Sequence, residues 1–256
     1  MPAAASTIEA GLFSEGAVPF RIEGIVNAAE MLGKPLSFRI TEARGERVIH
    51  ARQDTDSFDR VIGLARRNVR HWGMSTISRI AEDPSRLKPD AGRGLVAGIL
   101  SSQEGFHWLD EDREWFFFSN VAGNRVLTRI AKILSVASPI RVADLRVGIA
   151  RDYKMQDWLP PDAVLLQLCR HIDGVRVSGS AITAEPAISP KDVLCGIERD
   201  IVRVLAENGG CMPRAQFMET FLRRGIKHCT LYAHLTYSPI IYKPSRGYCG
   251  LIGRSL

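Results

Sequence analysis

Hydrophobic positions recur along the chain first at helical and then at alternating spacing. Amphipathic helices are predicted to begin near Ser57, Asn124 and Pro190, which are 67 and 66 residues apart. Short apolar hairpins are predicted 49, 51 and 50 residues after these starts, near Phe106, Val175 and Ile240. One block of helices and a hairpin is therefore predicted to occur three times.

The boundaries of the blocks follow from polar and proline-rich stretches. Residues 56–120 and 121–185 form the first two repeats, and residues 189–256 form the third after the linker Ala184–Asp192. Residues 1–55 are read as a flexible lead, over 1–18, followed by a helix and hairpin that form either a degenerate fourth repeat or a separate module. The predicted fold class is α+β, mainly α with small β-hairpins.

The third repeat has the most informative order of elements. A helix from Pro190, a second helix, a turn at Gly225, a third helix from Lys227 and a hairpin turning at 244–247 follow one another. This is the order of a winged helix, whose third helix enters the major groove while the hairpin contacts the backbone or the minor groove. We expect all three repeats to be winged helices.

The formal net charge of +6 is distributed unevenly. Residues 190–256 carry ten basic and five acidic side chains, and residues 121–185 carry nine and six. The two segments before residue 121 are each slightly acidic. A basic C-terminal block favours a polyanionic partner, with duplex DNA expected first and RNA left open.

Helical spacing predicts which side chains of the third repeat meet nucleic acid. Leu231 and Leu235 should face the core, which leaves the opposite face of the third helix for the ligand. Side chains there suit base edges, whereas those of the hairpin and the second helix suit phosphates or the minor groove. The candidate residues are Arg223, Arg224, Lys227, Thr230, His234, Lys243 and Arg246.

Two clusters outside the third repeat allow alternative interpretations. The aromatic run at 115–118, with Trp108, is either a hairpin core or a platform on which bases stack, and the core is favoured. Arg125, Arg129 and Lys132 form a candidate basic stripe, and the segment with Lys154 and Trp158 is a candidate contact loop.

Candidate chemistry is sparse. The five cysteines show no CxxC spacing and read as reduced thiols, and a zinc site from His228, Cys229 and His234 is disfavoured because the first two point differently on a helix. No motif of a hydrolase, nucleotide-binding enzyme or metalloprotease occurs in a credible context, so neither a catalytic residue nor a cofactor is predicted. No apolar stretch reaches membrane-spanning length, and a cytoplasmic protein is expected.

Segments 108–155, 165–184 and 228–254 resemble a bacterial family of sigma-factor-like helix-turn-helix proteins with tandem winged helices related to the HARE-HTH group. The resemblance covers residues 58–254 and implies DNA binding in transcription regulation or antiviral genome defence. It offers no catalytic residues. Residues 1–55 show no sigma-region motif, which argues against direct promoter recognition. The alternative is a protein-interaction adaptor that docks RNA polymerase or a defence complex.

Overall fold

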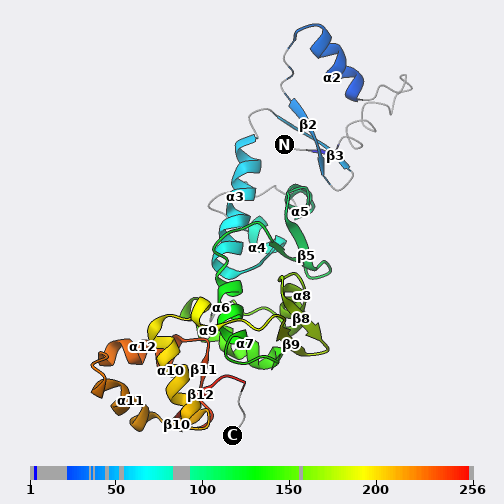
Figure 1. Ribbon diagram of the computed structural model, residues 1–256. Helices are drawn as coiled ribbons and strands as arrows, with labels where there is room; N and C mark the ends of the chain where they lie inside the picture. The colour runs from blue at the N-terminus through cyan, green and yellow to red at the C-terminus, as the bar shows by residue number, and fades with distance from the viewer. Residues whose placement is uncertain are drawn as a thin grey trace. The chain divides into compact units, whose positions relative to one another are not determined.

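Helices and small three-stranded antiparallel sheets alternate along the chain (Figure 1). The computed structural model describes residues 3–4, 22–34, 36, 38–43, 46–51, 55–82, 93–155 and 158–253. The chain divides into an N-terminal body, residues 1–69 and 74–121, and a C-terminal body, residues 70–73 and 122–256. The mixture of helices and small sheets confirms the coarse fold class that the sequence predicts.

The N-terminal module has the predicted helix and hairpin. Helix α2 spans Ile22–Met31, and strands β2 (Phe38–Ala43) and β3 (Glu46–Ala51) pair in register. The short strand β1 (Ala3–Ala4) pairs with β3, so these two residues are part of the sheet and not of a flexible lead. The remainder of the predicted lead lies outside the described residues.

The first repeat contains three helices and a three-stranded sheet ordered β4-β6-β5. Its elements are α3 (Thr55–Trp72), β4 (Ser75–Thr76), α4 (Ile77–Ala81), α5 (Arg93–Ser101), β5 (Phe106–Asp110) and β6 (Trp115–Phe118). Thr76 caps the start of helix α4, because its side chain accepts a hydrogen bond from Arg79 N at 3.2 Å. Five consecutive residues of α5, 96–100, are buried, so this helix lies mostly inside the repeat.

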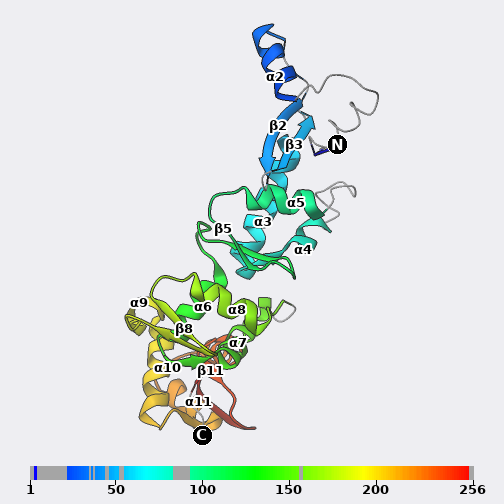
Figure 2. The same cartoon turned by 90° about the vertical axis from the view of Figure 1, so that its right-hand side faces the viewer.

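The second repeat, whose helices α6, α7 and α8 are labelled in Figure 2, has a sheet ordered β7-β9-β8. Its elements are α6 (Arg125–Leu134), β7 (Ile140–Arg141), α7 (Val142–Ala150), the 3-10 turn η2 (Tyr153–Met155), α8 (Asp162–Arg170), β8 (Val175–Ser178) and β9 (Ala181–Ala184). Asn124 starts α6 by accepting from Leu127 N at 3.2 Å, and its amide donates to Gly73 O at 2.9 Å. Helix α8 is packed against its surroundings, with four buried apolar residues.

The third repeat begins with two helices where the sequence predicts one. Its elements are α9 (Pro190–Val193), α10 (Gly196–Glu207), β10 (Cys211–Pro213), α11 (Arg214–Arg223), α12 (His228–Tyr237), β11 (Ile241–Tyr242) and β12 (Tyr248–Leu251). The break at Leu194–Cys195 lets Glu198 accept a hydrogen bond from Cys195 N at 3.0 Å in a capping box, which starts α10 afresh. The sheet order is β10-β12-β11.

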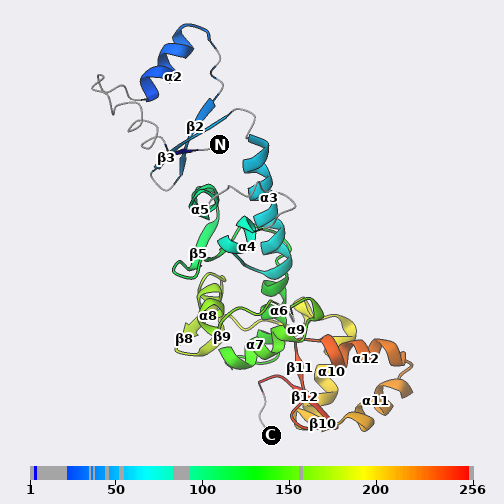
Figure 3. The same ribbon diagram turned by 180° about the vertical axis from the view of Figure 1, so that it is seen from behind.

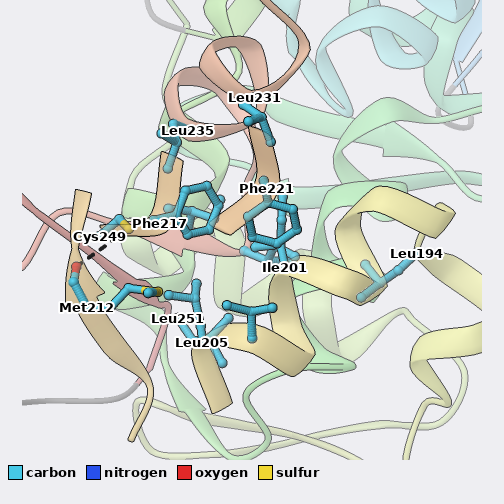
Figure 4. Close-up of a cluster of buried hydrophobic side chains, with 13 residues drawn as sticks. Leu194, Ile201, Leu205, Met212, Phe217, Phe221, Leu231, Leu235, Cys249 and Leu251 are labelled. Carbon is cyan, nitrogen blue, oxygen red and sulfur yellow. Dashed lines mark hydrogen bonds between the residues drawn. The ribbon is translucent and has the colours of Figure 1, made fainter. Parts of the chain in front are cut away.

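The core of the third repeat is built between its helices and its sheet. Figure 4 shows Phe217 and Phe221 of α11 lying between Leu231 and Leu235 of α12 on one side and Leu205 of α10 on the other. All five are buried, and the rings of Phe217 and Phe221 lie 4.7 Å apart. The prediction that Leu231 and Leu235 of α12 face the core is therefore confirmed.

In all three repeats a short strand follows the first long helix, comes directly before the next helix and pairs with the last strand. These strands of two or three residues were not predicted, because alternation cannot be seen over so short a stretch. In the third repeat this strand aligns Pro213 with Tyr248 and Cys211 with Gly250, and so fixes the start of α11 beside the hairpin. The pairing positions the residues described next.

Candidate nucleic-acid interface

The predicted cations of the third repeat occupy its turns and its hairpin. Arg223 and Arg224 end α11, Lys227 immediately precedes α12, and Lys243 and Arg246 lie between β11 and β12. All five side chains are exposed. From residue 208 to residue 253 the chain has six Lys and Arg residues and one carboxylate, Glu219. A phosphate backbone would meet almost no opposing negative charge on this stretch.

The two arginines at the end of α11 have different surroundings. Arg223 donates to Glu219 at 2.5 Å, one helical turn away, and both side chains are exposed. Exposed pairs of this kind are weak, so Arg223 can exchange Glu219 for a phosphate at little cost. The guanidinium of Arg224 lies 5.5 Å from the ring centroid of Phe221. Stacking on that ring orients Arg224 without using its hydrogen-bond donors.

Arg214 is a cation of this region that the sequence reading missed. Its backbone N–H donates to Gly247 O at 2.8 Å, which ties the start of α11 to the tip of the hairpin. Its guanidinium lies 5.5 Å from the ring of Tyr232, a side chain on α12 that is 50% exposed. Arg214 thus joins the start of α11, the middle of α12 and the hairpin. This position of Arg214 depends on the pairing of β10 with β12, and the sequence pattern does not predict β10.

Thr230 and His234 lie on a different flank of α12 from Tyr232. Both are half-buried, whereas Tyr232 is exposed. Burial lowers the pKa of His234; the positive charge of Lys132 acts in the same direction and the negative charge of Glu198 opposes it. Glu198 lies on α10 and Lys132 on α6, so His234 is at the junction of the second and third repeats. We therefore leave His234 out of the candidate interface, whereas the side chain of Thr230 keeps partial exposure.

The junction of the second and third repeats contains a buried ion pair. Lys132 Nζ lies 2.8 Å and 2.7 Å from the two carboxylate oxygens of Glu198, whose side chain is 5% exposed. Burial alone would raise the pKa of Glu198, but the hydrogen bonds from Lys132 and Cys195, with the charge of Lys132, bring it below its ordinary value. Glu198 is therefore ionised in the folded chain at neutral pH, and its burial depends on Lys132.

The end of α12 is held by an arginine of the second repeat. The Nε atom of Arg151 donates to Ser238 O at 2.9 Å, and its Nη2 donates to Leu235 O. These carbonyls close the last turn of α12 and have no partner within the helix. Gly148 packs beneath the same segment, since a Cβ there would lie 2.8 Å from Pro239 O and 2.5 Å from Ile252 Cδ1. The end of α12, a helix labelled in Figure 3, is thus held by contacts with the second repeat.

The basic stripe predicted on α6 is neutralised within the C-terminal body. Arg129 forms an ion pair with Asp152, whose side chain is 6% exposed, with Nη2 and Oδ2 2.6 Å apart. Lys132 is engaged by Glu198. Arg125 is half-buried. The candidate basic stripe of these three residues is therefore not a row of unpaired cations, because Arg129 and Lys132 form ion pairs with Asp152 and Glu198. The second repeat does offer Lys154, which is half-buried, as is Trp158.

The hairpin of the first repeat has the opposite character to that of the third. Its turn carries Asp110, Glu111, Asp112 and Arg113, and the last three are exposed. Residues 115–118 are buried, so these aromatic side chains form the core of the hairpin and are not a platform for bases. The favoured interpretation of the aromatic run is thereby confirmed, and its acidic tip would repel phosphate.

Two of the five cysteines, Cys169 and Cys249, are buried. Burial raises the pKa of Cys169 to about 12 and that of Cys249 to about 11, so both stay protonated. All five cysteines are free thiols. Within the described ranges, no group of three His, Cys, Asp or Glu side chains has the geometry of a metal site. The helices of those ranges likewise include none with the length and apolar character needed to cross a bilayer.

A search against known protein families finds no match for this chain, and a search among curated proteins finds none either.

Proposed function

We propose that the chain is a non-catalytic protein that binds duplex DNA through its third repeat, as a transcription regulator or a factor in genome defence. The observation that carries the proposal is the placement of six cations on α11, the turn before α12 and the β11–β12 hairpin, where Glu219 is the only carboxylate. The order helix, strand, helix, helix, hairpin with a β10-β12-β11 sheet supports a winged helix. In that design these three places face the nucleic acid.

The roles divide by element. Arg223 and Arg224, next to the turn at Gly225, are suited to phosphates. Lys227 and the exposed N-terminal half of α12 are placed to enter the major groove, with Thr230 at the edge of the contact. Lys243 and Arg246 on the hairpin are suited to the minor groove or the backbone. Arg214 holds the hairpin against α11 and adds a sixth cation.

The first test is fluorescence anisotropy of the whole chain with duplex DNA, single-stranded DNA and duplex RNA across a salt series. We expect duplex DNA to bind most tightly, with an affinity that falls steeply as salt rises, because neutralised phosphates release counterions. In Lys227→Ala with Arg246→Ala, the magnitude of the log–log salt slope should fall by about 2.

The matched control removes the same charge elsewhere. Arg60 and Arg67 are exposed on α3 of the first repeat, and Arg60→Ala with Arg67→Ala should leave the salt slope unchanged. Equal losses in both double variants would show that only net charge matters and would refute the assigned interface. A preference for duplex RNA would retain the interface and change the partner.

A second candidate function is that of a protein-interaction adaptor that docks RNA polymerase or a defence complex. It is favoured by the exposed acidic turn at 110–113 in the first repeat, which suits a basic protein surface better than phosphate. Stable capture of RNA polymerase by the whole chain, lost in Glu111→Lys with Asp112→Lys, would support it. The absence of nucleic-acid binding in the anisotropy series would make it the leading candidate.

A further inference from the structure

Two tyrosines from different repeats meet on the surface of the C-terminal body. Tyr153 of η2 is 56% exposed and Tyr237 of α12 is 43% exposed. Their ring centroids lie 5.5 Å apart at an interplanar angle of 67°. The ammonium of Lys154 lies 5.4 Å from the centroid of the Tyr153 ring. We call these three side chains the tyrosine platform.

The backbone beneath the platform is held by buried polar contacts. Arg151, two residues before Tyr153, binds the carbonyls of Leu235 and Ser238 on either side of Tyr237. Asp152 is buried; its Oδ2 is paired with Arg129, and its Oδ1 accepts from Lys154 N at 3.1 Å. The rings therefore stay exposed on a support that is fixed before any ligand binds. Large apolar rings kept at a surface in this way are typical of a binding site.

The charge of this half of the chain and the two exposed rings favour a negatively charged ligand with flat rings. Residues 121–256 carry nineteen Lys and Arg side chains against eleven Asp and Glu, and Lys154 lies beside the Tyr153 ring. Bases of unpaired nucleotides stack on exposed tyrosines regardless of sequence, and neighbouring cations contact their phosphates. Paired bases cannot do this, since their faces are already covered within the duplex.

The platform also lies at one end of the candidate DNA helix. Helix α12 begins after Lys227 and ends at Tyr237, and its ten residues span roughly 15 Å. Nucleic acid held at the start of α12 and at the hairpin can thus continue along the helix to the two tyrosines. Lys154 would contact the phosphate of the nucleotide that stacks there.

We propose that the tyrosine platform binds unpaired nucleotides that extend from a duplex held by the third repeat, so that the chain prefers junctions of double and single strands. The proposal rests on the proposed DNA binding and specifies its substrate. Tyr237 provides the stacking surface from the third repeat and Tyr153 provides it from the second. The two repeats therefore complete one site together.

The test compares three fluorescent probes with the same duplex, of which one is blunt, one has a single-stranded overhang, and one has an overhang of abasic nucleotides. The overhang should bind about tenfold more tightly than the blunt duplex, since stacking of one base on an aromatic ring is worth about 1–3 kcal/mol. The abasic overhang, which keeps its phosphates, should bind like the blunt duplex. Tyr153→Ala and Tyr237→Ala should each lose most of the preference, and Tyr153→Phe and Tyr237→Phe should keep it.

The outcomes separate this proposal from the proposed function. The tyrosine platform would be overturned if the protein bound duplex DNA in a salt-dependent way but showed no preference for the overhang. It would also be overturned if both alanine variants kept that preference. In either case the proposed duplex binding would stand. If the abasic overhang is preferred as strongly as the normal overhang, the protein contacts only its phosphates. If the phenylalanine variants lose the overhang preference as fully as the alanine variants do, the preference depends on the tyrosine hydroxyl groups. Either result overturns stacking. If no probe binds, both proposals fail together.

Discussion

The first and third repeats share an order of elements and a sheet topology but present opposite surfaces. In the first repeat the third helix, α5, is buried over residues 96–100, and the hairpin turn is acidic. In the third repeat only Leu231 and Leu235 of α12 are buried, and the hairpin turn carries Lys243 and Arg246. The comparison teaches that the shared topology does not determine the surface of a repeat. Under the proposed function, the exposure of the third helix and the charge of the hairpin are what would distinguish a repeat that binds DNA from one that does not.

The largest expected effect tests the burial of α5 against the exposure of α12. Leu100→Ala removes a fully buried side chain from α5 and should destabilise the N-terminal body by about 3 kcal/mol. Tyr232→Ala on α12 should cost about 0.5 kcal/mol, because half of that side chain is already in water. Urea unfolding with hydrogen exchange separates the two bodies. Duplex binding that stays at the wild-type level in Leu100→Ala would support the division of roles, and a large loss would contradict it.

Charge reversal at the third hairpin should give the next largest effect. Lys243→Glu with Arg246→Glu replaces two charge-assisted contacts with repulsion and should weaken duplex binding about 100-fold. Arg60→Glu with Arg67→Glu makes the same change of net charge on the first repeat. It should weaken duplex binding by less than about threefold at physiological salt. Anisotropy titrations measure both. Similar losses would mean that the two repeats do not differ as proposed.

Two helical glycines, Gly148 in the second repeat and Gly63 in the first, differ in how closely other atoms surround them. Gly148→Ala would place a Cβ against Pro239 O and Ile252 of the third repeat and should destabilise the C-terminal body by about 2 kcal/mol. Gly63 on α3 of the first repeat has open space around it, so Gly63→Ala should stabilise its helix by about 0.5–1 kcal/mol. Opposite shifts of the thermal midpoint are expected. A neutral Gly148→Ala would show that the contact with the third repeat is loose.

The junction of the second and third repeats should make the C-terminal body sensitive to acid. His234, which faces Glu198 and Lys132, has a lowered pKa, so the unfolded chain takes up a proton more readily and stability should fall as the pH drops below about 6.5. Glu198, whose pKa is also lowered, contributes stability above the ordinary carboxyl pKa of about 4.3, and this is lost at lower pH. Urea unfolding at a series of pH values measures both steps. His234→Gln should remove the loss of stability that begins below about pH 6.5. His228 is exposed, and His228→Gln should leave that loss unchanged.

The smallest effect is expected from giving the first hairpin a positive charge. Glu111→Lys with Asp112→Lys changes two exposed side chains and should leave stability unchanged. Duplex binding should rise by about threefold at low salt through long-range attraction, and the gain should vanish as salt increases. A gain that persists at high salt would indicate direct contact by the first repeat, and the contrast between the hairpins would no longer hold.

The sequence predicts the repeats well because their signals are local. Helix starts near Asn124 and Pro190 and hairpins at Phe106 and Val175 follow from spacing alone, and the structure has elements beginning at or next to these positions. The strand at Cys211–Pro213 was missed because three residues carry no period.

The differences between the sequence pattern and the structure have a tertiary cause. His234 lies on the polar face of α12, which periodicity assigns to solvent, yet its side chain is half-buried and its pKa responds to the charges of Glu198 and Lys132. Lys132 and Arg129 are helical surface positions in the sequence, but carboxylates from elsewhere in the chain neutralise them. Arg214 became visible only through its contacts with Gly247 and Tyr232. Spacing identifies the faces of one helix, but it does not show which neighbour covers them.

The contact of Arg151 with the end of α12 has a consequence for how the chain can evolve. A gene duplication that copied only residues 189–256 would produce a third repeat without the arginine that binds the last carbonyls of α12 and without the lysine that neutralises Glu198. The copy would also lose the tyrosine that faces Tyr237. We therefore expect the second and third repeats to be inherited, lost or transferred together, with residues 122–256 as the smallest heritable piece.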